Sequence, residues 1–108
     1  MYQAKILITI KTHDREKEKV FESTLFKDCE LPFPPTLNMT ISFDDVGVLP
    51  PVQSIEWNAS GNYFVCRCAD EMAVVEIGKY QEHKFHDNYA RAKYKNFGWM
   101  NFEIDDDY

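Results

Sequence analysis

The fold is set by the first strand-forming stretch, which reads YQAKILITIK over residues 2–11. Its side chains alternate, so that Ile6, Ile8 and Ile10 fall on one side and mostly polar residues on the other. A period of two with β-branched residues predicts a β-strand that turns one face to the core. The following residues 12–19, THDREKEK, contain no apolar side chain and indicate a solvated turn or a frayed helical start.

Residues 20–31 fit either a helix or a strand. A helix would place these residues on one face: Val20, Phe21, Thr24 and Leu25. A strand would place Phe21 and Leu25 on one side and Val20 and Phe26 on the other. The strand is favoured, because the polar segment before it has the length of a long hairpin loop. We therefore expect residues 20–31 to pair back onto residues 2–11.

The middle of the chain predicts a connector followed by another strand. Residues 31–35, LPFPP, cannot form a helix or a central strand, because proline lacks a backbone donor and fixes φ. We expect an extended connector with Phe33 turned inward. Residues 36–43 alternate and predict a third strand, which a turn at 44–47 ends.

The clearest hairpin pairs residues 52–58 with residues 63–69 around the turn Ala59-Ser60-Gly61-Asn62. Its first strand carries Trp57, which we expect in the core. Residues 72–77 form another short apolar run and predict a further strand.

The C-terminal part predicts the single helix of the chain. Residues 86–97 have helical spacing, with Asp87 as the expected N-cap and Gly98 as the expected C-terminal cap. Residues 99–104 alternate and predict a final strand. The fold class is therefore α+β, with a mostly antiparallel sheet or small barrel of about six strands and one short C-terminal helix.

The sequence predicts one domain over residues 1–104, followed by an acidic tail at 105–108. A chain of 108 residues with 44% hydrophobic and 15% aromatic residues suits one packed core. The expected core consists of Ile6, Ile8, Ile10, Phe21, Leu25, Phe33, Met39, Ile41, Phe43, Ile55, Trp57, Phe64, Cys66, Val74, Ile77, Tyr89 and Trp99.

The sequence indicates a cytoplasmic protein that does not enter a membrane. It has no apolar run of the roughly 20 residues that a bilayer crossing needs, and no recognisable signal peptide. Its three cysteines are an odd number and do not form a disulfide framework. A nucleophile elbow, a phosphate-binding glycine loop and a dinucleotide fingerprint are all missing, so we expect no enzyme activity and no cofactor.

The charge is segregated along the chain. The formal net charge is −6, and residues 28–78 carry eight acidic side chains against one basic side chain. An acidic surface attracts a basic partner and selects against acidic ones. The sequence therefore predicts a small acidic protein that regulates or inhibits a basic partner protein. The candidate partner-binding residues are Asp44, Asp45, Asp70 and Glu71.

Two other uses of the chain compete with this prediction. Single-stranded nucleic acid could bind basic residues that are interleaved with aromatic rings, although the net charge opposes it. Those basic residues are Lys84, Arg91, Lys93 and Lys95. A third reading is a structural domain without enzyme activity.

A metal site has weak candidates only. Its possible ligands are Cys66, Cys68, His83 and His86, the donor types of a zinc site. The Cys-x-Cys spacing is not that of a zinc knuckle, and small core cysteines explain the thiols equally well. We therefore expect no bound metal.

Overall fold

The computed structural model describes residues 1–14, 19–75 and 82–102. The strands are β1 (Tyr2–Asp14), β2 (Lys19–Leu31), β3 (Ser42–Phe43), β4 (Gly47–Val48), β5 (Val52–Asn58), β6 (Tyr63–Cys68), β7 (Glu71–Val75) and β8 (Met100–Asn101). The helices are α1 (Glu82–Lys93) and the 3₁₀ helix η1 (Lys95–Phe97). This composition confirms the predicted fold class, a strand-rich chain with one short C-terminal helix.

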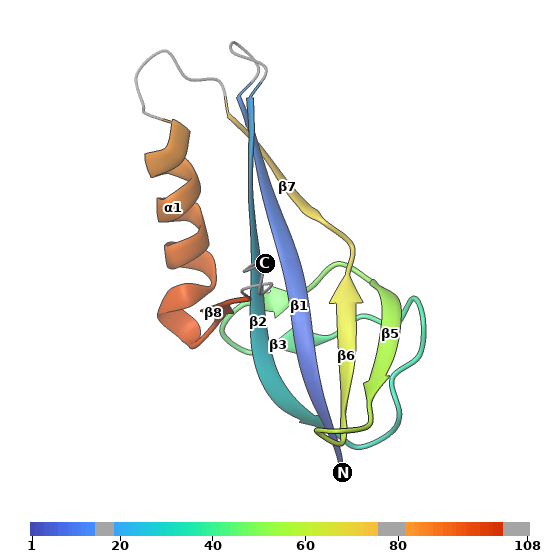
Figure 1. Ribbon diagram of the computed structural model, residues 1–108. Coiled ribbons are helices and arrows are strands. Elements are labelled where there is room, and N and C mark those ends of the chain that lie inside the picture. Colours follow the sequence, from blue (N-terminus) through green and yellow to red (C-terminus); the bar gives the residue numbers. More distant parts are fainter. Residues whose placement is uncertain (15–18, 76–81, 103–108) are drawn as a thin grey trace.

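Six strands form one open sheet in the order β5-β6-β1-β2-β8, with β7 also paired to β1 (Figure 1). β1 and β2 form the predicted long hairpin, in antiparallel register from Tyr2 opposite Leu31 to Asp14 opposite Lys19. The predicted hairpin of β5 and β6 is also present, with Trp57 opposite Phe64. The sheet does not close into a barrel, and it is mixed because β6 and β7 both run parallel to β1.

β6 and β7 lie one after the other along the same edge of β1. β6 pairs with residues 4–7 of β1, and β7 pairs with residues 10–14. The chain leaves the ladder between them, where the amide of Ala69 donates instead to the carbonyl of Pro51 at 2.8 Å. The two short strands therefore act as one interrupted strand, and β1 is hydrogen-bonded on both sides.

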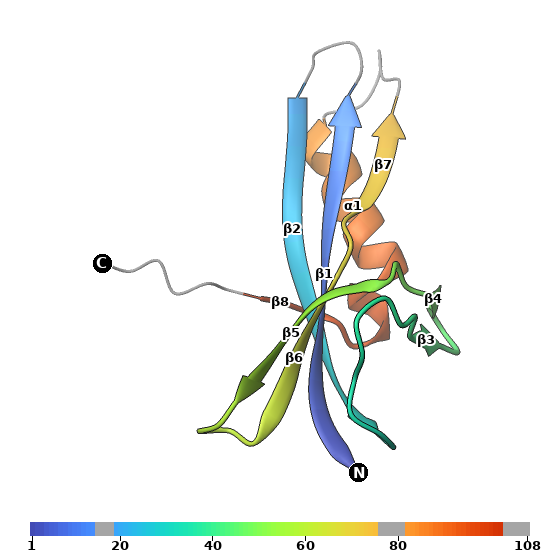
Figure 2. The same ribbon diagram turned by 90° about the vertical axis from the view of Figure 1, so that its right-hand side faces the viewer.

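The core lies between one face of this sheet and two elements that cover it, α1 and the β3–β4 hairpin (Figure 2). Alternation along β1 sends Ala4, Ile6, Ile8 and Ile10 into this core. Trp99 joins the two covering elements, because its ring lies edge-on to Tyr94 and to Phe43, at centroid distances of 5.2 and 5.6 Å. We call the opposite side of the sheet the open face.

The predicted strand over residues 36–43 is wrong for most of its length. Only Ser42 and Phe43 form a strand, although the carbonyl of Met39 accepts from Val52 N and that of Ile41 accepts from Leu49 N, both at 2.9 Å. Asn38 has a positive φ of 69°, a conformation that breaks regular strand geometry. This segment is therefore an irregular hairpin arm that reaches strand geometry only beside β4.

Two aromatic residues expected in the core are exposed. Phe33 is 53% exposed, and within the LPFPP connector Pro35 is buried instead. Trp57 is 52% exposed although it stands in the predicted strand, since β5 is an edge strand of the sheet. It packs against Phe64 at a ring distance of 4.8 Å. The hairpin was therefore predicted correctly and the burial of its tryptophan was not.

The helix begins earlier than predicted. α1 starts at Glu82, so Asp87 lies inside the helix and is not its N-cap. Gly98 does end the helical region with a φ of 91°, but it follows η1. The final strand is only Met100–Asn101. The predicted strand residues 103–104, the tail 105–108, Ile77 and the side chain of Val74 lie outside the described residues.

Candidate interaction surface

The open face carries the side chains that alternate along each strand with the core-facing ones. β1 contributes Lys5, Leu7, Thr9 and Lys11 to it. Their partners on β2 are Asp28, Phe26, Thr24 and Glu22. Within the described ranges neither α1 nor the β3–β4 hairpin lies over this side, since both pack against the buried side of the sheet. The open face is therefore a broad surface that strands alone present.

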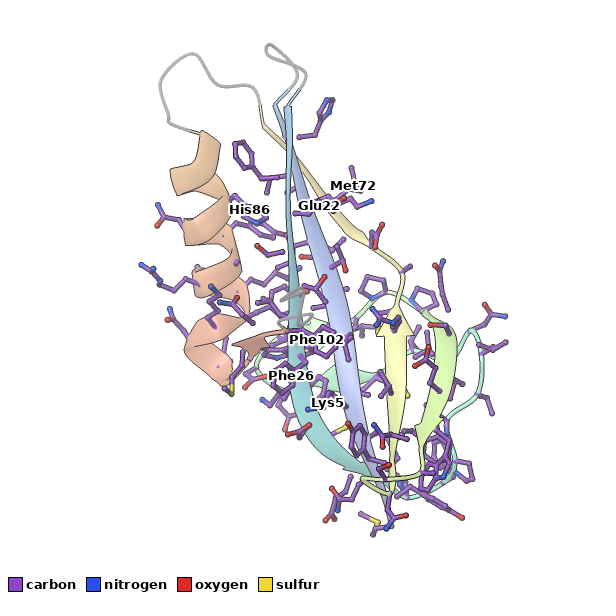
Figure 3. The ribbon with its side chains drawn as sticks, in the orientation of Figure 1. Lys5, Glu22, Phe26, Met72, His86 and Phe102 are labelled. Atoms are coloured by element: carbon purple, nitrogen blue, oxygen red, sulfur yellow. The ribbon has the colours of Figure 1, made fainter. Side chains whose placement is uncertain are left out.

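One row of side chains crosses the open face, apolar on β8, β2 and β1 and polar on β6 and β5. The strand register places these residues side by side from β8 to β5: Met100, Phe26, Leu7, Arg67 and Ser54. Leu7 is only 1% exposed although no helix covers it. Phe102 explains this burial, because its ring lies 6.2 Å from Phe26 on one side of Leu7 and 5.7 Å from the Arg67 guanidinium on the other. We call Leu7, Phe26, Met100 and Phe102 the apolar centre, of which Phe26 and Phe102 are labelled in Figure 3.

Charged pairs lie on both sides of the apolar centre. Lys5 Nζ lies 3.2 Å from an Asp28 oxygen and 4.0 Å from the centre of the Phe26 ring. Lys11 Nζ contacts carboxylates of Glu22 at 3.2 Å and Asp70 at 2.9 Å. The hydrogen bond to Asp70, followed by that to Glu22, raises the pKa of Lys11. Lys11 is thus held as a cation between two carboxylates, whereas Lys5 forms an ion pair with one.

The carboxylates stand farther out than the cations they neutralise. The Lys5 side chain is 21% exposed and its partner Asp28 is 69% exposed. The Lys11 side chain is 30% exposed, against 58% for Glu22 and 46% for Asp70. A partner approaching this surface meets carboxylate oxygens first, even where each is already paired. Exposed ion pairs of this kind contribute little to stability, so they leave the carboxylates available for other contacts.

The described side chains of the open face are acidic in sum. Its carboxylates are Glu22, Asp28, Glu30, Glu56 and Asp70. Its cations are Lys5, Lys11 and Arg67. Two shallow hollows lie on this face. One of about 280 Å³ lies beside Asp28 and Tyr63, and one of about 360 Å³ is lined by Asp70 together with Leu7, Arg67 and Ser54.

The four acidic residues chosen from the sequence do not form one surface. Asp70 lies on the open face beside Lys11. Asp44 and Asp45 lie in the turn between β3 and β4, on the other side of the sheet, and Asp45 is 3.8 Å from Lys27. Glu71 points away from the open face toward α1. The open-face carboxylates that the sequence did not predict as binding residues are Glu22, Asp28, Glu30 and Glu56.

Glu71 is the acceptor of a buried polar cluster between β7 and α1. Its side chain is only 14% exposed. It accepts hydrogen bonds from Tyr89 Oη at 2.8 Å, Tyr94 Oη at 2.7 Å and Lys93 Nζ at 2.7 Å. Burial and then the bond to Glu71 raise the pKa of both tyrosines. Burial alone would lower the pKa of Lys93, but the Glu71 carboxylate outweighs it and the pKa is raised.

The four basic residues that were candidates for binding nucleic acid do not form one described surface. Lys93 is bound to Glu71 and does not face outward as a free cation. Arg91 is exposed and Lys95 is half-exposed at the end of the helical region. The side chain of Lys84 lies outside the described residues. Only two of these cations are therefore described on the surface.

The cysteines and histidines are not gathered into one site. Cys66 and Cys68 are buried in the core, where burial raises the pKa of each thiol to about 11. His86 binds Thr12 of β1 at 2.9 Å. Cys66 pairs with Ile6, which lies six residues before Thr12 on the same strand. This separation corresponds to roughly 20 Å along β1. His83 lies outside the described side chains. Among those that are described, no three potential ligands stand together.

His86 instead fastens α1 to the sheet. It is 4% exposed, and its ring lies between the Thr12 hydroxyl at Nδ1 and the Ser23 hydroxyl at Nε2, at 2.9 and 2.6 Å (Figure 3). Phe21 packs beside the ring. This arrangement gives the helix a polar anchor near the far end of the β1–β2 hairpin.

Comparison of the chain with known protein families, with curated proteins and with solved structures gave no match. In the described ranges, no helix combines the length and the apolar character that crossing a bilayer requires.

Proposed function

We propose that this chain is a small binding protein that regulates or inhibits a basic partner protein, and that it does so through its open face. The observation that carries this proposal is the arrangement of exposed carboxylates around an apolar centre, on a sheet face that no helix covers among residues 1–14, 19–75 and 82–102. Apolar contacts at the centre of an interface supply much of its affinity, whereas surrounding charges select the partner and speed encounter.

The charge on this face favours a protein partner over nucleic acid. Phosphate groups would meet the outward carboxylates of Asp28 and Glu22 before they reached Lys5 or Lys11. A partner rich in lysine and arginine would be attracted by the same carboxylates. An acidic binding protein, as expected from composition, would thus use Asp70 and other carboxylates of the sheet face in place of Asp44, Asp45 and Glu71.

The test compares two doubly neutralised variants that change the net charge equally. Glu22→Gln/Asp28→Asn removes two carboxylates from the open face, and Asp44→Asn/Asp45→Asn removes two from the β3–β4 turn. Each protein is immobilised and used to capture proteins from a lysate of the source cells at low and at high salt. We expect a basic protein that is retained by wild type and by the turn variant and is at least tenfold depleted on the open-face variant.

Equal recovery on all three proteins would contradict the proposal, as would the absence of any basic protein whose capture weakens with salt. Loss of capture on the turn variant alone would place the surface at Asp44 and Asp45 instead.

A further inference from the structure

The open face limits what kind of segment can occupy it. Carboxylates lie at two places along the strands: Asp28 beside Lys5, and Glu22 with Asp70 beside Lys11. The two lysines are six residues apart on β1, which corresponds to roughly 20 Å. The apolar centre lies between these two places, at Leu7 and Phe26. A matching segment therefore has cations near both ends and large apolar side chains between them.

The hollows repeat this pattern. Asp28 lines the hollow at one end and Asp70 lines the hollow at the other, and Leu7 of the apolar centre also lines the second hollow. Lys5 and Arg67 also line these hollows. Lys5 is tucked between Asp28 and Phe26, so its charge is already balanced when a second cation arrives.

The need to pair the backbone hydrogen-bonding groups of the occupant favours a helical conformation. An extended segment lying on the face of a sheet would leave backbone groups unpaired against Phe26 and Phe102, whereas a helix pairs them internally. Helices are also the elements that cover sheet faces in layered folds, as α1 already does on the buried side. A rise of 1.5 Å per residue spans roughly 20 Å in about 13 residues.

We infer that the partner docks a cationic amphipathic helix of about four turns along β1 on the open face. Its apolar side chains pack on Phe26, Met100 and Phe102, and its lysine or arginine side chains reach Asp28 at one end and Glu22 with Asp70 at the other. This inference rests on the proposed function, because it describes how that partner would be recognised. A second copy of the chain is a poor occupant, because it would oppose carboxylates with carboxylates.

The probe is a synthetic amphipathic peptide of about four helical turns, built from leucine on one face and lysine toward both ends. A scrambled peptide of identical composition is the control for charge. Fluorescence anisotropy measures binding of both peptides to the full chain, and backbone amide NMR shifts locate the contact. We expect the amphipathic peptide to bind at least tenfold more tightly than the scrambled one, and to shift the amides of Leu7, Phe26 and Met100.

Two matched variants separate docking on the open face from binding elsewhere. Met100→Lys places a cation in the apolar centre, and Val48→Lys makes the same change at an exposed residue of β4, across the sheet. We expect Met100→Lys to weaken peptide binding at least tenfold and Val48→Lys to leave it within about twofold. Both residues are largely exposed, so neither change disturbs the core.

Equal binding of the two peptides, or amide shifts confined to β3, β4 and α1, would overturn the helix inference. Self-association of the free chain that Met100→Lys abolishes would also overturn it, in favour of a second copy. These outcomes leave the proposed function standing if the capture experiment succeeds. If no basic protein is captured but the amphipathic peptide still binds selectively, the proposed function is contradicted, whereas the open face still docks a cationic helix.

Discussion

Asp70 and Glu71 are neighbours in the sequence, yet the chain sends them to opposite faces of the sheet. Asp70 meets Lys11 on the open face, whereas Glu71 turns inward to Tyr89, Tyr94 and Lys93. The carboxylate of Glu71 satisfies the hydroxyl of Tyr94, a residue with no exposed surface. A buried donor without an acceptor is costly, so this single side chain holds β7 and α1 together.

We expect Glu71→Ala to lower the free energy of unfolding by about 2–4 kcal/mol, because it leaves the buried Tyr94 hydroxyl without its acceptor. Glu71→Gln keeps an acceptor oxygen and should cost less. Urea denaturation followed by circular dichroism measures both changes. Asp44→Ala in the exposed turn is the control and should stay within about 0.5 kcal/mol of wild type. A loss of stability for Glu71→Ala no greater than that of the control would contradict this role.

At the scale of elements, His86 and apolar packing hold the described part of α1 to the β1–β2 hairpin. His86 bridges Thr12 and Ser23, which stand on neighbouring strands. Ala90 in the helix and Tyr94 directly after it pack into the core. The polar anchor therefore fixes the position of the helix at one end, while its apolar residues supply most of the burial.

Replacing the anchor should loosen that end of the helix. We expect His86→Leu to destabilise the protein by about 1–3 kcal/mol, since it leaves the buried Thr12 hydroxyl without this partner. In a double-mutant cycle with Thr12→Val, the combined loss should be smaller than the sum of the single losses by at least about 0.5 kcal/mol. Hydrogen exchange should accelerate in α1 before it accelerates in β1. Strict additivity would show that the two side chains act independently.

Gly98 lets the chain turn from η1 into β8. Its φ of 91° lies in the left-handed region, and an added Cβ would meet no atom within 4 Å. The cost of Gly98→Ala is therefore conformational, and we expect a loss of about 1 kcal/mol in thermal or urea unfolding. No measurable loss would mean that the turn relaxes to a negative φ without affecting Trp99.

Local sequence patterns predicted the individual strands better than they predicted which strands pair with each other. Alternation identified β1 and placed Phe26 on the side of β2 opposite Leu25, which is the basis of the open face. The parallel pairing of β6 with β1 joins residues about sixty positions apart, and no local pattern reports it. Of the open-face carboxylates, the sequence predicted only Asp70 as a binding residue. The prediction grouped acidic residues that are adjacent in the sequence, whereas a strand places residues two apart on the same face.

At the scale of the whole molecule, most of the resolved pKa shifts share one direction. Burial raises the pKa of the Cys66 and Cys68 thiols from 9.0 to about 11, and it also raises the pKa of Tyr89 and Tyr94. A raised pKa in the folded state means that the unfolded chain loses these protons first as pH rises. Their contribution to stability is complete below pH 9 and declines above it.

We therefore expect the free energy of unfolding to fall between pH 9 and 11, by up to about 1.4 kcal/mol per pH unit for each buried thiol. Urea unfolding at half-unit steps of pH measures the slope. The variant Cys66→Ala/Cys68→Ala should be less stable at pH 7.5 and show a flatter decline between pH 9 and 10, before the tyrosines contribute. An unchanged slope in the variant would contradict the assignment to the thiols.

The central place of β1 has a consequence for biosynthesis. β1 precedes β2, β6 and β7 in the chain, and β2 can pair with it as soon as residue 31 has left the ribosome. Its other edge has to wait for residues 63–75, which begin 32 positions after the last residue of β2. During that interval a growing chain carries a long hairpin with one unpaired edge, the geometry on which strands of neighbouring nascent chains add. Chaperone demand should therefore peak before β7 is synthesised and end once β6 and β7 close that edge.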